Sequence, residues 1–233
     1  TFSASFYGDK NGNKIEISNQ TEADKILAHL DNASYVVSNI KKGVRNRQPA
    51  APFITATLQQ EASRKLNFNG QKTMRIAQSL YEGVDIDKIG STGLITYMRT
   101  DSLRISDEAR AAAKEYIVEN FGGEFYQNNV YSNKKKDVQD AHEAIRPSMV
   151  EIEPDSIKAS LTKEQYNLYK LIWSRFIASQ MAPAKFMNVS AVIENGDYGF
   201  RATGSKIIFE GYQKVYASKD EEANKLLPAL EKG

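Results

Sequence analysis

The chain changes its hydrophobic pattern twice between its ends. Hydrophobic and polar residues alternate over residues 1–17, and a loop of glycines and polar residues, 8–13, interrupts the alternation. This pattern predicts a β-hairpin, and the β-branched and aromatic stretch 35–40 predicts a further strand. Alternation returns over residues 188–215, so we expect strands and hairpins again near the end of the chain.

Between these β-rich ends, hydrophobic residues recur every three or four positions, which is the spacing of an amphipathic helix. Capping residues, glycines and prolines predict a short helix after Thr21 and four longer helices. The residues that mark the boundaries of the four longer helices are Thr57, Gly70, Gly83, Ser106, Gly122, Thr162, Gln165 and Pro183. The last helix carries an aromatic stripe that we expect in the core: Tyr166, Tyr169, Trp173 and Phe176.

We therefore predict an α+β multidomain protein, with a β-rich domain made of two separated segments and a mainly α-helical domain inserted between them. The first β-rich segment spans residues 1–55, the helical domain 56–182 and the second β-rich segment 183–233. Pro52 lies near the first boundary, because proline interrupts regular backbone hydrogen bonding.

Composition narrows the class of protein without identifying it. The chain has 233 residues, 41% of them hydrophobic, which suits a folded core and argues against disordered and fibrous classes. Lys and Arg number 31 against 29 Asp and Glu, so a contact with nucleic acid has to use a local patch. The lack of cysteine, of a membrane-spanning run and of a secretory leader favours the cytoplasm. Because a strand-like pattern is under way at Thr1, we expect a piece of a longer protein.

The most informative motif is the run 93–102, Gly-Leu-Ile-Thr-Tyr-Met-Arg-Thr-Asp-Ser. It places the phenol of Tyr97 two residues from the guanidinium of Arg99. A deprotonated tyrosine attacks a phosphodiester, and an arginine binds phosphate oxygens and stabilises the charge that grows on them. Residues such as Thr96 and Asp101 disfavour a helix interior, so we expect an extended segment or a loop, where Tyr97 and Arg99 share a face.

A second motif, residues 140–148, contributes His142 and Arg146. The near-neutral pKa of histidine suits a phosphate contact or protonation of a departing oxygen. If residues 141–145 form a helical turn, both side chains project to one side and address adjacent phosphates.

A basic segment, residues 41–47, comes before the prolines. Its four cations, Lys41, Lys42, Arg45 and Arg47, are enough to contact several phosphates as the chain leaves a strand.

The motifs around Tyr97 and His142, in this order along the chain, closely resemble those of type IA DNA topoisomerases. The resemblance extends over essentially the whole chain, including the basic segment and residues 52–62. It implies that Tyr97 attacks a DNA phosphodiester and becomes joined to the 5′ phosphate, leaving a free 3′ hydroxyl. It also implies that Arg99 and His142 are catalytic, and that DNA phosphates are bound by Thr96, Arg146, Lys41, Lys42, Arg45 and Arg47.

The same resemblance sets expectations for the rest of the protein. The β-rich domain is expected to be a hinged arch, and the intact enzyme to relax negatively supercoiled DNA with single-stranded character without ATP. The family holds Mg²⁺ through a TOPRIM domain, and no part of this chain resembles that domain or the second helical domain. We therefore expect no metal site in this piece, no relaxation by the piece alone, no membrane partner, and a monomer.

Each candidate residue also has a purely structural interpretation. Arg99 can pair with Asp101, His142 can be a hydrogen-bonding residue, and Arg146 can anchor the turn before Pro147. The basic segment can be an exposed strand edge, and His29 is expected on the solvent side of its helix.

Two other functional classes stay open. A noncatalytic single-stranded nucleic-acid-binding module does not require Tyr97, so Tyr97→Phe would leave its function intact. A tyrosine recombinase also uses arginine, histidine and tyrosine, but its tyrosine usually follows the other groups, whereas Tyr97 precedes His142.

Overall fold

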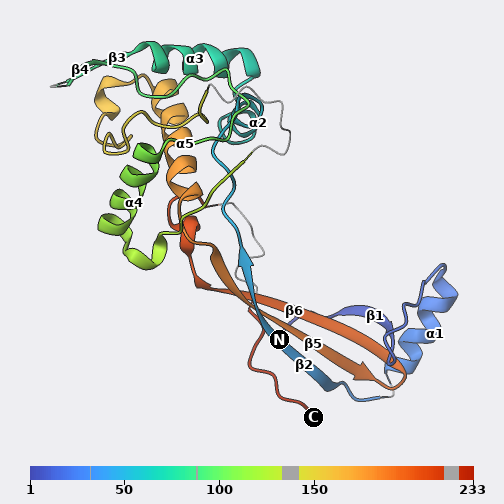
Figure 1. Ribbon diagram of the computed structural model, residues 1–233. Coiled ribbons are helices and arrows are strands. Elements are labelled where there is room, and N and C mark those ends of the chain that lie inside the picture. The colour runs from blue at the N-terminus through green and yellow to red at the C-terminus, as the bar shows by residue number, and fades with distance from the viewer. Residues whose placement is uncertain (32, 88, 133–141, 218–225) are drawn as a thin grey trace. The chain divides into compact units, whose positions relative to one another are not determined.

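The computed structural model describes residues 1–31, 33–87, 89–132, 142–217 and 226–233, which form two separately compact units (Figure 1). The β unit consists of the described residues of Thr1–Arg47, Ala184–Glu210 and Lys219–Gly233, and the helical unit of those of Gln48–Pro183 and Gly211–Ser218. Helices and antiparallel strands are both present, which confirms the predicted α+β class.

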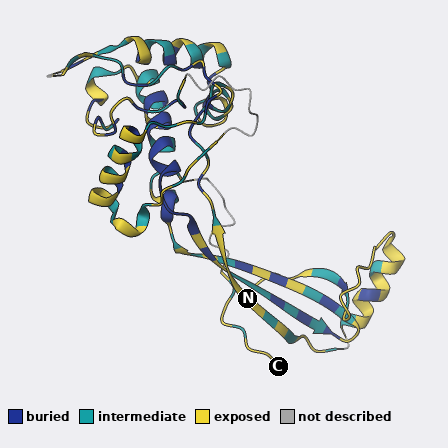
Figure 2. Ribbon diagram, in the orientation of Figure 1, coloured by how far each residue is buried: buried dark blue, intermediate teal, exposed yellow. Residues whose placement is uncertain are grey.

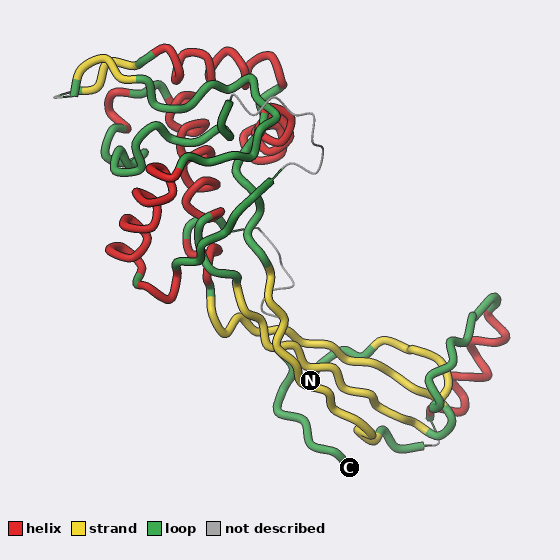
Figure 3. The backbone as a smooth tube through the Cα atoms, in the orientation of Figure 1, coloured by secondary structure: helices red, strands yellow, loops and turns green. Residues whose placement is uncertain are grey.

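A four-stranded antiparallel sheet is the framework of the β unit (Figure 3). Its strands, in sheet order, are β1 (Ser5–Asp9), β6 (Tyr198–Phe209), β5 (Ala184–Asn195) and β2 (Val36–Arg47). β5 and β6 form a hairpin in which Asn195 is paired with Tyr198 across a two-residue turn. The first turn residue, Gly196, has a φ of 61°, which glycine adopts without steric cost, and the hairpin expected near the end of the chain is confirmed.

The hairpin predicted over residues 1–17 is wrong. β1 pairs with β6 instead, and residues 13–18 have no regular secondary structure. The chain does turn after β1, because the Asp9 carboxylate accepts hydrogen bonds from the backbone and side-chain N–H groups of Asn13. Alternation correctly indicated a strand at the start of the chain, but it carried no information on its partner near the other end of the sequence.

The short helix α1 (Gln20–Leu30) is present, but Asn19 caps it instead of Thr21. The Asn19 side chain accepts a backbone hydrogen bond from the first turn. His29 is exposed, as expected, and its ring packs edge-on against Tyr198.

One face of the sheet carries the core of the β unit. β2 stays paired with β5 as far as Arg47, well beyond the predicted end at residue 40. The buried residues of this core are Ala191, Ile193 and Ala202, and the partly buried residues packed against them are Val37, Ile40, Phe200, Leu227 and Leu230.

The helical unit contains the four longer helices that the sequence predicts. They are α2 (Thr55–Leu66), α3 (Gly70–Glu82), α4 (Asp107–Phe121) and α5 (Lys163–Ser179). Its described residues also form a small hairpin, β3 (Val84–Ile86) and β4 (Gly90–Thr92), and the short 3₁₀ helices η1 (Gly123–Phe125), η2 (Lys158–Ser160) and η3 (Gly211–Lys214). Over the described ranges, the helices are too short or too polar to cross a bilayer.

The predicted start and end of α4, the start of α5 and the end of α3 agree with the structure. Ser106 caps α4, Thr162 begins the capping box of α5, and Gly83 ends α3 with a φ of 125°. α2 begins earlier than predicted, because Ile54 is its N-cap and the Thr57 hydroxyl accepts the Ile54 backbone N–H from inside the first turn.

α5 is the most buried helix of the helical unit (Figure 2). Tyr169, Trp173 and Phe176 are buried, as predicted for the aromatic stripe, whereas Tyr166 is half-buried. The polar ends of Tyr169 and Trp173 donate hydrogen bonds to backbone carbonyls in residues 150–152, and burial raises the pKa of the Tyr169 phenol. The stripe is therefore core and not a surface for stacking bases.

The helical unit starts before the predicted boundary at residues 55 and 56. Phe53 is fully buried and forms an isolated antiparallel bridge with Ile145. The chain from Gln48 onward packs with the helices for this reason.

The helical unit also includes a stretch that follows β6. The strand expected up to Val215 is wrong, because the chain turns at Gly211, which has a φ of 51°, and η3 follows. A Cβ atom at Gly211 would lie 2.5 Å from the carbonyl oxygen of Ala182, so the close approach requires glycine. The backbone N–H of Tyr212 then donates to the same carbonyl at 2.9 Å.

Candidate functional site

The segment that carries Tyr97 and Arg99 is an irregular connection between β4 and α4. It is held by three buried side chains, Leu94, Ile95 and Met98. The backbone N–H of Leu94 donates to the carbonyl of Leu80 on α3 at 2.7 Å. The predicted extended or loop conformation is confirmed.

The segment lies against α3 closely enough to require glycine at its start. A Cβ atom at Gly93 would lie 2.7 Å from the carbonyl oxygen of Tyr81. A larger residue would therefore push the Tyr97 segment away from α3.

The second motif runs alongside the first as an antiparallel partner. The Thr96 N–H donates to the Arg146 carbonyl and the Ser148 N–H to the Leu94 carbonyl, each at 2.9 Å. Residues 142–147 are not helical, so the helical turn considered for this motif is wrong where the structure describes it. The backbone N–H groups that a helix would use internally are instead donated to other segments of the helical unit.

This pairing brings Tyr97 and His142 together. Their ring centroids are 5.3 Å apart with an angle of 36° between the rings, and Tyr81 packs edge-on against Tyr97 at 5.4 Å. Tyr97 is half-buried and His142 is exposed. In the part of the chain that the structure describes, the Tyr97 hydroxyl has no hydrogen-bond partner.

Arg99 is exposed, and its backbone is fixed on both sides by Thr55 at the start of α2. The Thr55 hydroxyl lies 2.8 Å from the Met98 carbonyl oxygen, to which it donates, and accepts the Thr100 N–H at 2.9 Å. No ion pair or hydrogen bond engages the Arg99 guanidinium within the described ranges. A fixed backbone with a free guanidinium suits the binding of an external anion.

Thr96 and Arg146, predicted to bind phosphate, use their donors within the protein. The Thr96 hydroxyl donates to the Ala144 carbonyl at 2.7 Å and accepts the Arg146 N–H at 3.0 Å. Arg146 donates through Nε and Nη2 to Glu143, at 2.9 and 2.6 Å, and through Nη1 to the Pro147 carbonyl at 2.9 Å. This geometry favours the interpretation of Arg146 as the anchor of the turn.

The Arg146 charge also acts on the carboxylate of Glu108. The pKa of Glu108 is lowered, chiefly by a hydrogen bond from its own backbone N–H, then by one from the Ser106 side chain, with a smaller contribution from the Arg146 charge. With only 13% of its side chain exposed, Arg146 is already neutralised by protein groups.

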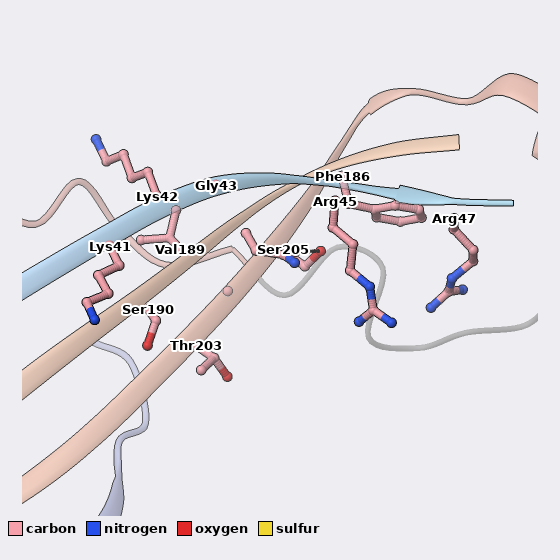
Figure 4. Close-up of a pocket in the computed structure, with 12 residues that line it drawn as sticks. Lys41, Lys42, Gly43, Arg45, Arg47, Phe186, Val189, Ser190, Thr203 and Ser205 are labelled. Carbon is pink, nitrogen blue, oxygen red and sulfur yellow. Dashed lines mark hydrogen bonds between the residues drawn. The ribbon is translucent and has the colours of Figure 1, made fainter. Parts of the chain in front are cut away.

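The basic segment belongs to the β unit, where β2 presents its cations on both sides. Lys41, Arg45 and Arg47 project to one side of β2 and Lys42 to the other (Figure 4). All four border a hollow of about 520 Å³ on the sheet, and β5 and β6 contribute further polar residues to it: Asn188, Ser190, Thr203 and Ser205. The Arg47 guanidinium also lies 5.1 Å from the ring centroid of Phe186.

We did not predict from the sequence that three residues would shape the site: Glu143, Thr55 and Tyr81. Glu143 had a local signal, because a carboxylate three residues before Arg146 is a common ion-pair spacing. Thr55 and Tyr81 had none, since each meets its partner only after the chain has folded.

Chemically, the site offers a phenol, an imidazole and a guanidinium. These groups suit nucleophilic attack, proton transfer and the binding of a phosphate-like anion. Among the described residues, no group of three or more His, Cys, Asp or Glu side chains is placed to hold a metal ion.

Comparisons with known proteins agree with this chemistry. A family model described as DNA topoisomerase matches residues 1–233. The full-length topoisomerase I of Thermotoga maritima is similar in structure, with a TM-score of 0.78 and 40% sequence identity. The match covers 94% of this chain and 36% of the Thermotoga enzyme, so the chain spans about a third of that protein's length.

Proposed function

The chain belongs to the type IA DNA topoisomerases, and from this premise we propose that it is the part of such an enzyme that cuts and carries one DNA strand. Tyr97 is the nucleophile, Arg99 binds the reacting phosphate, and His142 transfers a proton. The observation that carries the proposal is the Tyr97 ring packed 5.3 Å from the His142 ring, two residues before an exposed arginine.

Cleavage is a transesterification at phosphorus. The Tyr97 phenolic oxygen forms a bond to the phosphorus, the bond from phosphorus to the 3′ oxygen breaks, and the 5′ phosphate stays on the tyrosine. The phenol loses a proton and the departing 3′ oxygen gains one, and His142 is placed to take part in this transfer. Arg99 stabilises the negative charge that increases on the phosphoryl oxygens during attack.

Religation is the same reaction in reverse. The phosphotyrosine ester keeps the free energy of the broken phosphodiester, so the 3′ hydroxyl attacks it without ATP. Between the two steps another strand passes through the break, and negative supercoils are relaxed.

The exposed face formed by Lys41, Arg45 and Arg47 contacts the DNA backbone in this proposal. Cations in a row on one strand neutralise successive phosphates whatever the base sequence. Lys42 projects from the other side of β2 and contributes separately. Thr96 and Arg146 are left out of the direct contacts, because their donors are engaged within the protein.

Magnesium, which the resemblance implies, does not fit the residues of this chain that the structure describes. We assign Mg²⁺ to a TOPRIM domain elsewhere in the full-length enzyme and derive no step through it. The chain alone is then not expected to relax DNA.

Strand passage requires the cut strand to be moved and returned. We assign this to the β unit as a hinged arch and to the helical unit as the carrier of the covalently bound strand. The enzyme acts as a monomer on single-stranded regions of negatively supercoiled DNA.

Covalent capture of DNA tests the proposal. The full-length enzyme, with Mg²⁺ and end-labelled single-stranded DNA, is denatured and examined for labelled protein. Tyr97→Phe should abolish the adduct and leave the fold intact, since only a hydroxyl is lost. Tyr81→Phe is the matched control, because it removes the hydroxyl of the ring that packs against Tyr97 and should retain the adduct. An adduct in the Tyr97→Phe enzyme would reject Tyr97 as the nucleophile.

The exposed basic face also suits a noncatalytic single-stranded nucleic-acid-binding module. That alternative predicts no adduct in any enzyme and equal DNA binding by the wild-type and Tyr97→Phe proteins. The same experiment therefore separates the two functions.

A further inference from the structure

We infer that Thr96 is a positioning residue, whose hydroxyl holds the His142 segment at the distance that Tyr97 needs. The inference rests on the proposed function, because it deepens the cleavage site assigned there. Thr96 has no free donor for DNA, since its single hydroxyl proton is used by the Ala144 carbonyl at 2.7 Å.

Thr96 lies where the backbone pairing between the two motifs ends. The ladder consists of the Ser148 N–H to the Leu94 carbonyl and the Thr96 N–H to the Arg146 carbonyl. Beyond it, the Thr96 side chain accepts the Arg146 N–H and reaches the Ala144 carbonyl. The hydroxyl thus extends the pairing by one further step toward His142.

Ala144 lies two residues from His142 and is held through its backbone, while Glu143 between them is held through its carboxylate by Arg146. Ala144 is fully buried, its N–H donates to the Arg104 carbonyl at 2.9 Å, and its carbonyl is held by Thr96. His142 itself is exposed. Its ring position therefore depends on how firmly Ala144 is held.

Loss of the hydroxyl leaves a buried acceptor without its donor. Thr96→Val keeps the shape of the side chain, but the Ala144 carbonyl and the Arg146 N–H lose their partner. The local backbone has to shift to satisfy these groups, and the contact between Tyr97 and His142 loosens. Thr96→Ser restores the hydroxyl and should restore the contact.

Nuclear magnetic resonance of the DNA-free chain tests whether Thr96 keeps the Tyr97 and His142 rings in contact, independently of DNA cleavage. We expect the cross-relaxation between the Tyr97 and His142 ring protons to weaken in Thr96→Val and to persist in Thr96→Ser. Thr73→Val is the matched control, because the Thr73 hydroxyl likewise donates to a backbone carbonyl, that of Asn69, the N-cap of α3. An unchanged ring contact in Thr96→Val would overturn the inference.

Cleavage in the full-length enzyme supplies the second measurement. Single-turnover cleavage should fall by about tenfold to a hundredfold in Thr96→Val, the cost expected for a misplacement of about 1 Å, and should recover in Thr96→Ser. In an enzyme that already carries His142→Gln, Thr96→Val should have little further effect. Additive losses would overturn the inference, because they would show that Thr96 acts independently of His142.

Two further outcomes are distinguishable. If Thr96→Val and Thr96→Ala both fail to fold while Thr73→Val folds, Thr96 is required for the fold itself and the positioning role is rejected. If no Tyr97-dependent adduct forms, the proposed function fails, whereas the ring contact in the DNA-free chain still reports on what Thr96 holds.

Discussion

The Tyr97 site and the basic face of β2 present their charged and reactive groups in different ways. At the Tyr97 site, buried residues and hydrogen bonds between distant segments of the chain fix the backbone. Half-buried Tyr97 and exposed Arg99 therefore have defined positions. On β2, strand alternation alone directs three long cationic side chains to one side (Figure 4). The first arrangement suits a reaction that depends on geometry, and the second suits binding that depends on charge.

The difference predicts large effects of single substitutions on the reaction rate at the first region and small, graded effects on binding at the second. In the Tyr97 site, loss of one group should remove a step of the chemistry. On β2, loss of one cation should remove only its share of the attraction to phosphates. Single and double substitutions in the two regions can break this distinction.

Arg99→Ala should have the largest effect among them. We expect single-turnover cleavage at saturating DNA to fall by about a hundredfold to a thousandfold, because a preorganised donor to the transition state is lost. Arg99→Lys should recover only part of this loss, since an ammonium lacks the planar fork of a guanidinium. Rapid-quench assays of the labelled adduct measure the rate.

Arg104→Ala is the matched control for charge. Arg104 is also exposed and lies on the same connection before α4. If its loss slows cleavage as much as Arg99→Ala does, general charge and not a defined contact governs the site, and the distinction between the two regions fails.

Removal of Lys41 and Arg45 together should have a moderate effect on binding and none on chemistry. We expect affinity for single-stranded DNA to fall several-fold at low salt, and the slope of log affinity against log salt to decrease by about 0.7 for each lost contact. The cleavage rate at saturating DNA should stay unchanged. Fluorescence anisotropy over a salt series measures both affinity and slope.

Lys206→Ala provides the matched control on the same sheet. Lys206 is exposed, and its register partner Met187 adjoins the partner of Arg45, so Lys206 lies on the opposite face. An equal change in salt slope would show that overall charge, and not this face, binds DNA. A slower cleavage rate at saturation in the double variant would make the basic face part of the catalytic site.

How much the sequence reveals also differs between the two regions. Strand alternation is local, so the facing of Lys41, Arg45 and Arg47 follows once β2 is recognised. Helix caps are local as well, and Ser106 and Thr162 were predicted, whereas the caps of α1 and α2 were not. The partner of β1 was not, because pairing depends on a strand near the other end of the chain.

At the Tyr97 site, the sequence indicated the reactive groups but not what holds them. The phenol, imidazole and guanidinium were recognisable by type and order. The Thr96 hydroxyl, in contrast, acts on the carbonyl of Ala144, and no periodicity along the chain encodes a side chain bonded to a distant backbone. The resemblance placed both Thr96 and Arg146 on phosphate, although their donors are used within the protein.

The smallest predicted effect is on the free energy of unfolding, through the contact of Tyr216 with α2. Tyr216 follows η3 and donates a hydrogen bond to Glu61 on α2 at 3.1 Å, while the Lys65 ammonium lies 3.6 Å from its ring centroid. α2 begins at Thr55, which fixes the backbone around Arg99. The contact of Tyr216 with α2 therefore helps to stabilise the helix that positions Arg99.

The effect of Tyr216 should depend on pH. Burial raises the pKa of Tyr216 to about 12, above the unfolded value of about 10, so its contribution is complete below pH 10 and is lost as pH rises toward 12. Tyr216→Phe should lower the free energy of unfolding by about 1 kcal/mol at pH 8 and show a shallower decline above pH 10. Denaturation followed by the single tryptophan, Trp173 on α5, reports on the helical unit alone. Tyr81→Phe, at an exposed position of the same unit, should keep the wild-type decline, and an identical decline in Tyr216→Phe would show that this contact does not stabilise the framework.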